Sequence, residues 1–82
     1  YGNDRFTLFS REALPIRRLV IFDRWGEQVF ENHNFSTNNP ANGWDGTFRG
    51  KLVQPGVFVF FAEVEILPGK VVKMQGDVTL VR

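Results

Sequence analysis

Cysteine is absent from the chain and histidine occurs once, which excludes several kinds of site at the outset. Without cysteine there is no disulfide framework, no thiolate metal site and no thiol nucleophile. The one histidine, His33, has only Ser10 and Ser36 as serine partners, and no catalytic triad can be assembled from these residues. We therefore expect no enzyme activity, no catalytic residues and no cofactor, with His33 in a solvated loop.

The chain also lacks an excess of one charge and a long apolar run. Ten Lys and Arg stand against nine Asp and Glu, so the basic surface typical of nucleic-acid binding is missing. No stretch approaches the ~20 apolar residues of a membrane helix, and the opening YGNDRFTLFS lacks the pattern of a signal peptide. We expect one domain over residues 1–82, without nucleic acid and without direct membrane insertion.

Aromatic residues are what the chain has in quantity, with nine Phe, two Trp and one Tyr to form a core. The apolar residues recur at every second position, which predicts an all-β domain. We expect a first strand over residues 4–10, with Phe6 and Leu8 on one face, and a second strand from Pro15. The run 19–22 is apolar on both faces, which indicates a central strand.

The stretch DRWGEQVFE predicts a tight hairpin with tryptophan at its tip. Asp23 and Gly26 occupy the first and fourth positions of a type I turn, where glycine accepts a left-handed backbone. We expect the return strand to form the pairs Ile21–Val29 and Val20–Phe30. Trp25 then either packs back across the hairpin, with Arg24 stacked on it, or belongs to a presented surface.

Five of the six asparagines fall between residues 32 and 42, a stretch that predicts a loop. Asp45 and the neighbouring amides could offer oxygens to Ca²⁺, with Asn38, Asn39 and Asn42 as the candidates. No spaced run of carboxylates resembles a calcium loop, so we predict no metal ligands. Arg17 and Arg18 are expected on opposite faces of a strand, which does not make a phosphate site.

The stretch WDGTFRGK predicts a short strand ending at Gly50, and QPG a turn before the apolar segment 57–66. The even positions of that segment are expected to face the core. Its odd positions 57, 59 and 61 are either covered by another part of the chain, which we favour, or form a patch for a partner.

The last strand is expected to keep the same alternation. Gly76 lies at a core-facing position, where the ring of Phe60 is the expected neighbour. The residues predicted to face the core are Val72, Met74, Gly76, Val78 and Leu80, and those predicted to face out are Lys73, Gln75, Asp77 and Thr79.

Seven short strands with turns at regular intervals predict a small antiparallel immunoglobulin-like β-sandwich, with a flattened barrel as the alternative. Trp44 is expected to anchor the core at the rim of the sandwich, although exposed aromatic planes also serve in sugar and protein binding.

Several motifs occur in an order that resembles the gliding-motility-associated C-terminal domain, the type B sorting domain of the type IX secretion system of Bacteroidota. They are NDRF, LVIFDRWGEQVFE, WDGTFRGK, PGVFVF and the terminal GDVTLVR. Three departures stand out: the lead-in is reduced to YGND, Phe58 and Phe60 replace common tyrosines, and the Asn-rich loop is long. The first indicates a domain excised from a larger secreted protein.

The resemblance implies a C-terminal export signal that carries an N-terminal cargo through the periplasm and the outer membrane to the cell surface or the medium. The implied partners are type IX translocon components and an SprF-like outer-membrane escort protein. The candidate recognition surface is Trp25, Arg24, Thr79 and Arg82. The residues of the structural motifs are Asp23, Gly26, Trp44, Asp45, Gly46, Pro55, Gly56, Phe58, Phe60, Gly76, Val78 and Leu80.

Two other readings share the predicted fold, which by itself cannot decide function. One is an immunoglobulin-like adhesion or carbohydrate-binding module of a surface protein. The other is a structural cap similar to the immunoglobulin-like part of flagellar hook-capping proteins, which would self-assemble. For the sorting domain we expect a monomer.

Overall fold

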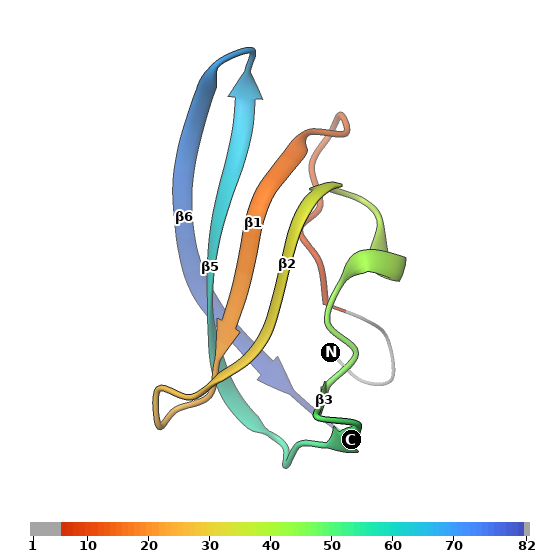
Figure 1. Ribbon diagram of the computed structural model, residues 1–82, viewed down its shortest axis with the longest axis vertical. Helices are drawn as coiled ribbons and strands as arrows, with labels where there is room; N and C mark the ends of the chain where they lie inside the picture. Colours follow the sequence, from red (N-terminus) through yellow and green to blue (C-terminus); the bar gives the residue numbers. More distant parts are fainter. Residues whose placement is uncertain (1–5, 82) are drawn as a thin grey trace.

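The computed structural model describes residues 6–81, which fold almost entirely as antiparallel β-sheet (Figure 1). The larger sheet has four strands in the order β2-β1-β5-β6, and β3 pairs with β4 in a separate two-stranded sheet. The elements are β1 (Pro15–Phe22), β2 (Gln28–Ser36), the 3-10 turn η1 (Pro40–Asn42), β3 (Thr47–Phe48), β4 (Lys51–Leu52), β5 (Gly56–Leu67) and β6 (Lys70–Leu80). The predicted small all-β sandwich is confirmed. Between residues 6 and 81 the structure has no helix that is long and apolar enough to cross a membrane.

Strand β1 lies in the interior of the larger sheet, as its apolar run predicts. It pairs with β2 on one side and β5 on the other, and Leu19, Val20 and Ile21 are all buried. Because β1 is flanked by a strand at each edge, side chains of β2 and β5 help to cover it on both faces, so its apolar run is buried on each face.

The second layer of the sandwich is formed mainly by irregular segments, residues 6–14 and 37–53, which we call the loop layer (Figure 1). Phe6 and Trp44 form an isolated antiparallel bridge, with N···O distances of 2.7 and 2.9 Å. The Thr37 amide donates to the Leu14 carbonyl at 2.9 Å, which ties the two segments together. Backbone groups in this layer are therefore satisfied by each other rather than by a regular ladder.

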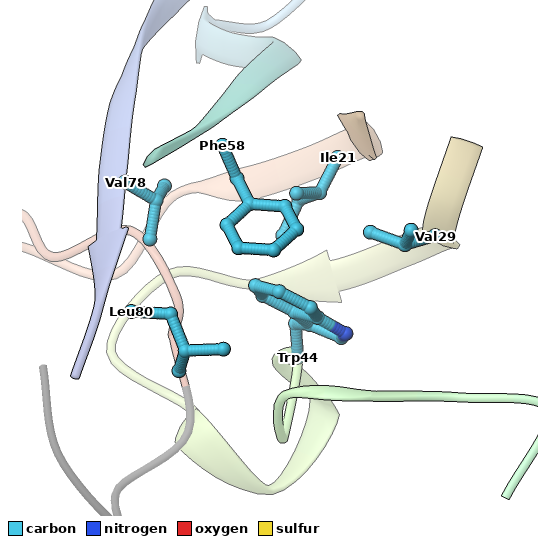
Figure 2. Close-up of a cluster of buried hydrophobic side chains, with 6 residues drawn as sticks. All are labelled: Ile21, Val29, Trp44, Phe58, Val78 and Leu80. Atoms are coloured by element: carbon cyan, nitrogen blue, oxygen red, sulfur yellow. The ribbon is translucent and has the colours of Figure 1, made fainter. Parts of the chain in front are cut away.

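The core lies between the sheet and the loop layer, in two clusters. The first surrounds Trp44, whose ring meets that of Phe58 edge to face at 4.9 Å (Figure 2). Its other buried members are Ile21, Val29, Val78 and Leu80. The second cluster consists of Ile16, Leu19, Ala62 and Val64. Trp44 is only 1% exposed, so the predicted core anchor is confirmed.

The strand predicted over residues 4–10 does not form within the described residues. Apart from the bridge at Phe6, this segment has no strand, and positions 4 and 5 lie outside the described residues. Its polar groups bond to the loop opposite: the Leu8 carbonyl accepts from the Asn38 amide, and the Ser10 amide donates to the Asn38 side chain. Phe6 and Leu8 nevertheless pack against the same core cluster, as predicted.

The predicted pairing between β1 and β2 is wrong by one residue. Ile21 lies opposite Phe30 and Val20 opposite Glu31, whereas Phe22 lies opposite Gln28. Val29 is therefore the extra residue of a β-bulge. The bulge lets Val29 join the core cluster beside its neighbour Phe30, which simple alternation would place on the other face.

The Asn-rich stretch is a loop only in its second half. Strand β2 continues to Ser36, because Phe35 pairs with Ile16 and packs against the second core cluster. Asn34 accommodates the irregularity with a φ of +57°, a conformation that asparagine accepts more readily than most residues. Similarly, the strand predicted to end at Gly50 is a tight hairpin, with Arg49 and Gly50 between β3 and β4.

Strands β5 and β6 form a long hairpin whose register follows the predicted alternation. Phe60 pairs with Gly76, and a Cβ atom built on Gly76 would lie 2.7 Å from the Phe60 ring, so the predicted close approach is confirmed. Val78 and Leu80 are buried. Met74 and Ile66 lie at core-facing positions of the alternation but are 45% and 38% exposed. The β5–β6 hairpin extends past the ends of β1 and β2, and β6 lies at the edge of the sheet, where less of the chain covers it (Figure 1).

Gly26 has a φ of +85°, and its amide donates to the Asp23 carbonyl at 3.0 Å, so the predicted turn is confirmed. A Cβ at Gly26 would meet nothing within 4 Å, which leaves backbone strain as the cost of substitution. Gly26→Val should lower the free energy of unfolding by at least about 1 kcal/mol in urea titration. Gly26→Asn is the matched control and should lose less; equal stability of the valine variant and the wild type would contradict the turn.

Candidate recognition surface

The turn between β1 and β2 is held by a single carboxylate. Asp23 Oδ1 accepts hydrogen bonds from the amides of Trp25 and Glu27, at 2.9 and 2.8 Å, and the Asp23 amide donates to the Glu27 carbonyl at 2.9 Å. These bonds fix the backbone on both sides of Trp25. The side chain therefore projects from a rigid turn.

Trp25 is 81% exposed, so it does not pack back across its hairpin. The guanidinium of Arg24 nevertheless lies over its ring, 5.2 Å from the centroid, a stacking that the sequence predicts only for a tryptophan packed across the hairpin. A cation stacked on an exposed ring makes a surface that can contact apolar, aromatic and acidic groups of a partner at low conformational cost.

A groove of about 220 Å³ lies beside this turn. Its other wall comes from the β3–β4 hairpin and the QPG turn. The residues that line it are Asp23, Arg24, Trp25, Glu27, Val29, Phe48, Val53, Gln54, Pro55, Gly56, Val57 and Phe58. Val29 and Phe58 also belong to the core, so the floor of the groove is the outer side of the first core cluster.

A second stacked pair at this groove was missed by the sequence reasoning. The guanidinium of Arg49 lies 4.9 Å from the centroid of the Phe48 ring. Arg49 has a φ of +55° and Gly50 of +78°, values typical of a two-residue hairpin turn in which Asn-Gly is usual. The sequence feature that indicates this hairpin is the Arg-Gly pair between two short apolar stretches. We call Arg24, Trp25, Phe48, Arg49 and the groove between them the turn-tip surface.

The remaining predicted recognition residues are placed differently. Thr79 is exposed on β6 and pairs with Val57, which lines the groove, so it is one strand away from the turn-tip surface. Arg82 lies outside the described residues. The structure thus brings together Arg24 and Trp25 but separates Thr79 from them by a strand.

The WDG motif has a structural role. The indole Nε1 of Trp44 donates to the Thr47 carbonyl at 2.9 Å, while Asp45 Oδ1 accepts from the Thr47 amide at 3.0 Å and from its hydroxyl at 2.6 Å. Gly46 has a φ of +83°. These contacts turn the chain sharply from the core toward β3.

His33 lies in strand β2, not in a loop as predicted, because β2 is longer than the Asn-rich pattern indicates. Its Nε2 is 2.9 Å from Glu31 Oε2, and the same oxygen accepts from Arg18 Nε at 3.1 Å. The hydrogen bonds from Arg18 and then Gln28 hold the pKa of Glu31 below its ordinary value of 4.5. This contribution to stability is present above that value and is lost as the pH falls through the lower folded-state pKa.

The prediction that Arg17 and Arg18 alternate between faces is wrong. The register of β1 against β5 shifts between Ile16 and Arg18, so Arg17 is an extra residue of a bulge. Arg17 forms an ion pair with Glu65, and Arg18 forms one with Glu31. Each cation already has a carboxylate partner, so this pair is not a basic patch.

The sheet face away from the loop layer is partly apolar and open. Val57 is 50% and Phe61 43% exposed, so the favoured expectation that the chain covers this face is wrong. The cause is that the loop layer packs only against the opposite face. A shallow groove of about 670 Å³ runs here, lined by Arg18, Val20, Phe22, Phe61, Ala62, Glu63, Lys73, Met74 and Gln75.

Comparison with protein families decides between the readings that the fold leaves open. The model of the CHU_C type IX secretion signal domain matches residues 2–80. The chain belongs to this family. No curated protein and no solved structure matches the chain.

As a type IX secretion signal domain, the protein serves export to the cell surface or the medium, in interaction with the secretion system and attached to a cargo. The match gives no support to an adhesion or carbohydrate-binding module. A signal of this kind acts through its interaction with the secretion system.

The secretion signal domain should not depend on calcium. The side-chain oxygen of Asn38, a candidate ligand that the sequence pattern does not favour, accepts from the Ser10 amide at 2.8 Å, and Asp45 Oδ1 accepts from the Thr47 amide. Within residues 6–81 no cluster of three or more His, Asp or Glu side chains could hold a metal. A chelator should therefore leave the midpoint of thermal unfolding unchanged in differential scanning calorimetry. A drop of several degrees would instead indicate that the Asn-rich loop binds calcium.

Proposed function

We propose that this domain is a non-catalytic C-terminal sorting signal that directs an N-terminally attached cargo through the type IX outer-membrane translocon. The observation that carries the proposal is the family match over residues 2–80, which spans all six strands that the structure describes. The segment that matches the family therefore coincides with the folded domain, which supports a signal that acts as a whole domain. A signal of this size is read as a surface rather than as a short linear peptide.

The proposed route begins with delivery of the whole protein to the periplasm by the Sec pathway. The domain folds there and is bound by an SprF-like escort protein at the outer membrane, which passes it to the translocon. Sequence features of the gliding-motility-associated type B class support this route. The cargo then reaches the cell surface or the medium.

The proposed contact is the turn-tip surface. Trp25 is the most exposed large apolar side chain among the described residues, and the bonds of Asp23 hold it on a rigid turn. Rigid aromatic residues contribute contact area with little loss of side-chain entropy, which is why they are enriched at interfaces. The guanidinium of Arg49 over the Phe48 ring adds a second stacked pair to this surface.

Export can be tested by fusing residues 1–82 to the C-terminus of a neutral reporter in a host with the type IX machinery. We expect the reporter in the medium or on the surface, and retention in the periplasm when the translocon is deleted. A reporter that stays in the periplasm of the intact host would contradict the proposal.

The turn-tip surface is tested by Trp25→Ala in the same fusion. Because Trp25 is 81% exposed, the unfolding midpoint should change little, while export and escort binding should fall several-fold. Phe9→Ala is the matched control, since Phe9 is also an exposed aromatic, at 70%, and lies in the loop layer. Equal export by both variants would exclude Trp25 as the contact.

Variants of the terminal strand test whether the export signal is recognised as a folded domain or as a linear peptide. Val78 is 4% exposed, and Val78→Asp places an uncompensated carboxylate in the core, so both folding and export should be lost. Thr79→Ala combined with Arg82→Ala should leave the circular dichroism melt intact and lower export. Normal export by an unfolded Val78→Asp domain would instead establish a linear address.

A further inference from the structure

The two edges of the larger sheet differ in how open they are to another strand. Strand β2 is interrupted by the bulge at Val29 and by the left-handed Asn34, and the loop layer follows it directly. Within residues 6–81, strand β6 pairs only with β5, contains no proline, and keeps an unbroken register from Leu80 to Val71. A long, regular edge with one row of unbonded backbone groups is a template for strand addition.

The sequence of β6 is complementary to itself. In an antiparallel pair of identical strands, a register centred on Gln75 places Lys73 opposite Asp77 of the second copy, and Asp77 opposite Lys73 of the second copy. Both residues are exposed, and both lie on the sheet face that carries Glu63 and Val59, their partners in β5. The described part of the chain gives neither Lys73 nor Asp77 an ion pair of its own.

Neighbouring registers lose this complementarity. Opposite residues of an antiparallel pair belong to the same hydrogen-bonding class, so the register can shift only in steps that keep odd residues opposite odd ones. Other centres place Lys73 opposite itself, Asp77 opposite itself, or each charge opposite an uncharged side chain. Like charges directly opposite are destabilising, so only the register centred on Gln75 gains two ion pairs.

The other face of β6 fits the same register. The register centred on Gln75 places Met74, which is 45% exposed, opposite Gly76 of the second copy. The ring of Phe60 lies over Gly76, so the thioether would meet an aromatic edge, a contact that methionine favours. Val72 would likewise lie opposite Val78 of the second copy.

We propose that two copies of this domain associate through antiparallel pairing of their β6 strands, which joins the larger sheets into one continuous sheet of two-fold symmetry. The interaction is independent of the proposed route of export. It differs from the monomer expected from the sequence, because the alternation pattern does not reveal which strand lies at the edge. The contact is one strand wide, so the dimer is reversible and forms in a concentration-dependent way.

Sedimentation velocity of the chain at concentrations from micromolar to millimolar tests whether this β6–β6 dimer forms. The wild type should shift from monomer to dimer. Asp77→Lys and Lys73→Asp each place like charges opposite one another, so each variant alone should remain monomeric. An equimolar mixture of the two restores both ion pairs and should form a one-to-one dimer.

Two control variants reverse a charge elsewhere, Lys51→Asp on β4 and Glu12→Lys in the loop layer, and should dimerise as the wild type does. Both β6 substitutions are at exposed positions, and a circular dichroism melt checks that each variant is folded. A wild type that stays monomeric over the whole range overturns the proposal. A wild-type dimer with a mixture that remains monomeric also overturns it, because the interface then lies elsewhere.

Discussion

The indole of Trp44 connects the loop layer to the sheet, and the rest of the domain depends on this contact. The indole ring packs against Phe58, and its Nε1 donates to the Thr47 carbonyl. The backbone of Trp44 pairs with that of Phe6. Gly43 precedes it because any Cβ there would collide with the Phe6 carbonyl. A sheet of four strands cannot bury an apolar face alone, so the loop layer that Trp44 anchors completes the core.

The same cluster lies against the turn-tip surface, the contact proposed for this secretion signal domain. Val29 and Phe58 face Trp44 on one side and line the groove of the turn-tip surface on the other. The bulge at Val29, which lies close to the Asp23 turn, brings the Val29 side chain into the core. A disturbed core would therefore move the groove walls, so a partner bound at the proposed contact would distinguish the folded domain from the unfolded one.

The sequence predicted the features that depend on local chemistry. The two-sided apolar run of β1, the Asp23–Gly26 turn and the approach of Phe60 to Gly76 all follow from alternation or from glycine. The features it missed depend on distant contacts. The bulge at Val29 shifts the register, and core packing of Phe35 extends β2 into an asparagine-rich stretch. The sequence does not decide whether Trp25 is exposed, because alternation does not reveal which faces the loop layer covers.

The opposite environments of the two tryptophans give the domain two separate optical reporters. Trp44 lies in an apolar cluster away from water, whereas Trp25 is exposed to solvent beneath a guanidinium. Their emission therefore differs in wavelength, and a water-soluble quencher reaches only Trp25. Loss of the core changes the blue-shifted component, while contact at the tip changes the red-shifted one. Binding of a partner and unfolding of the domain can thus be followed in one sample without an added label.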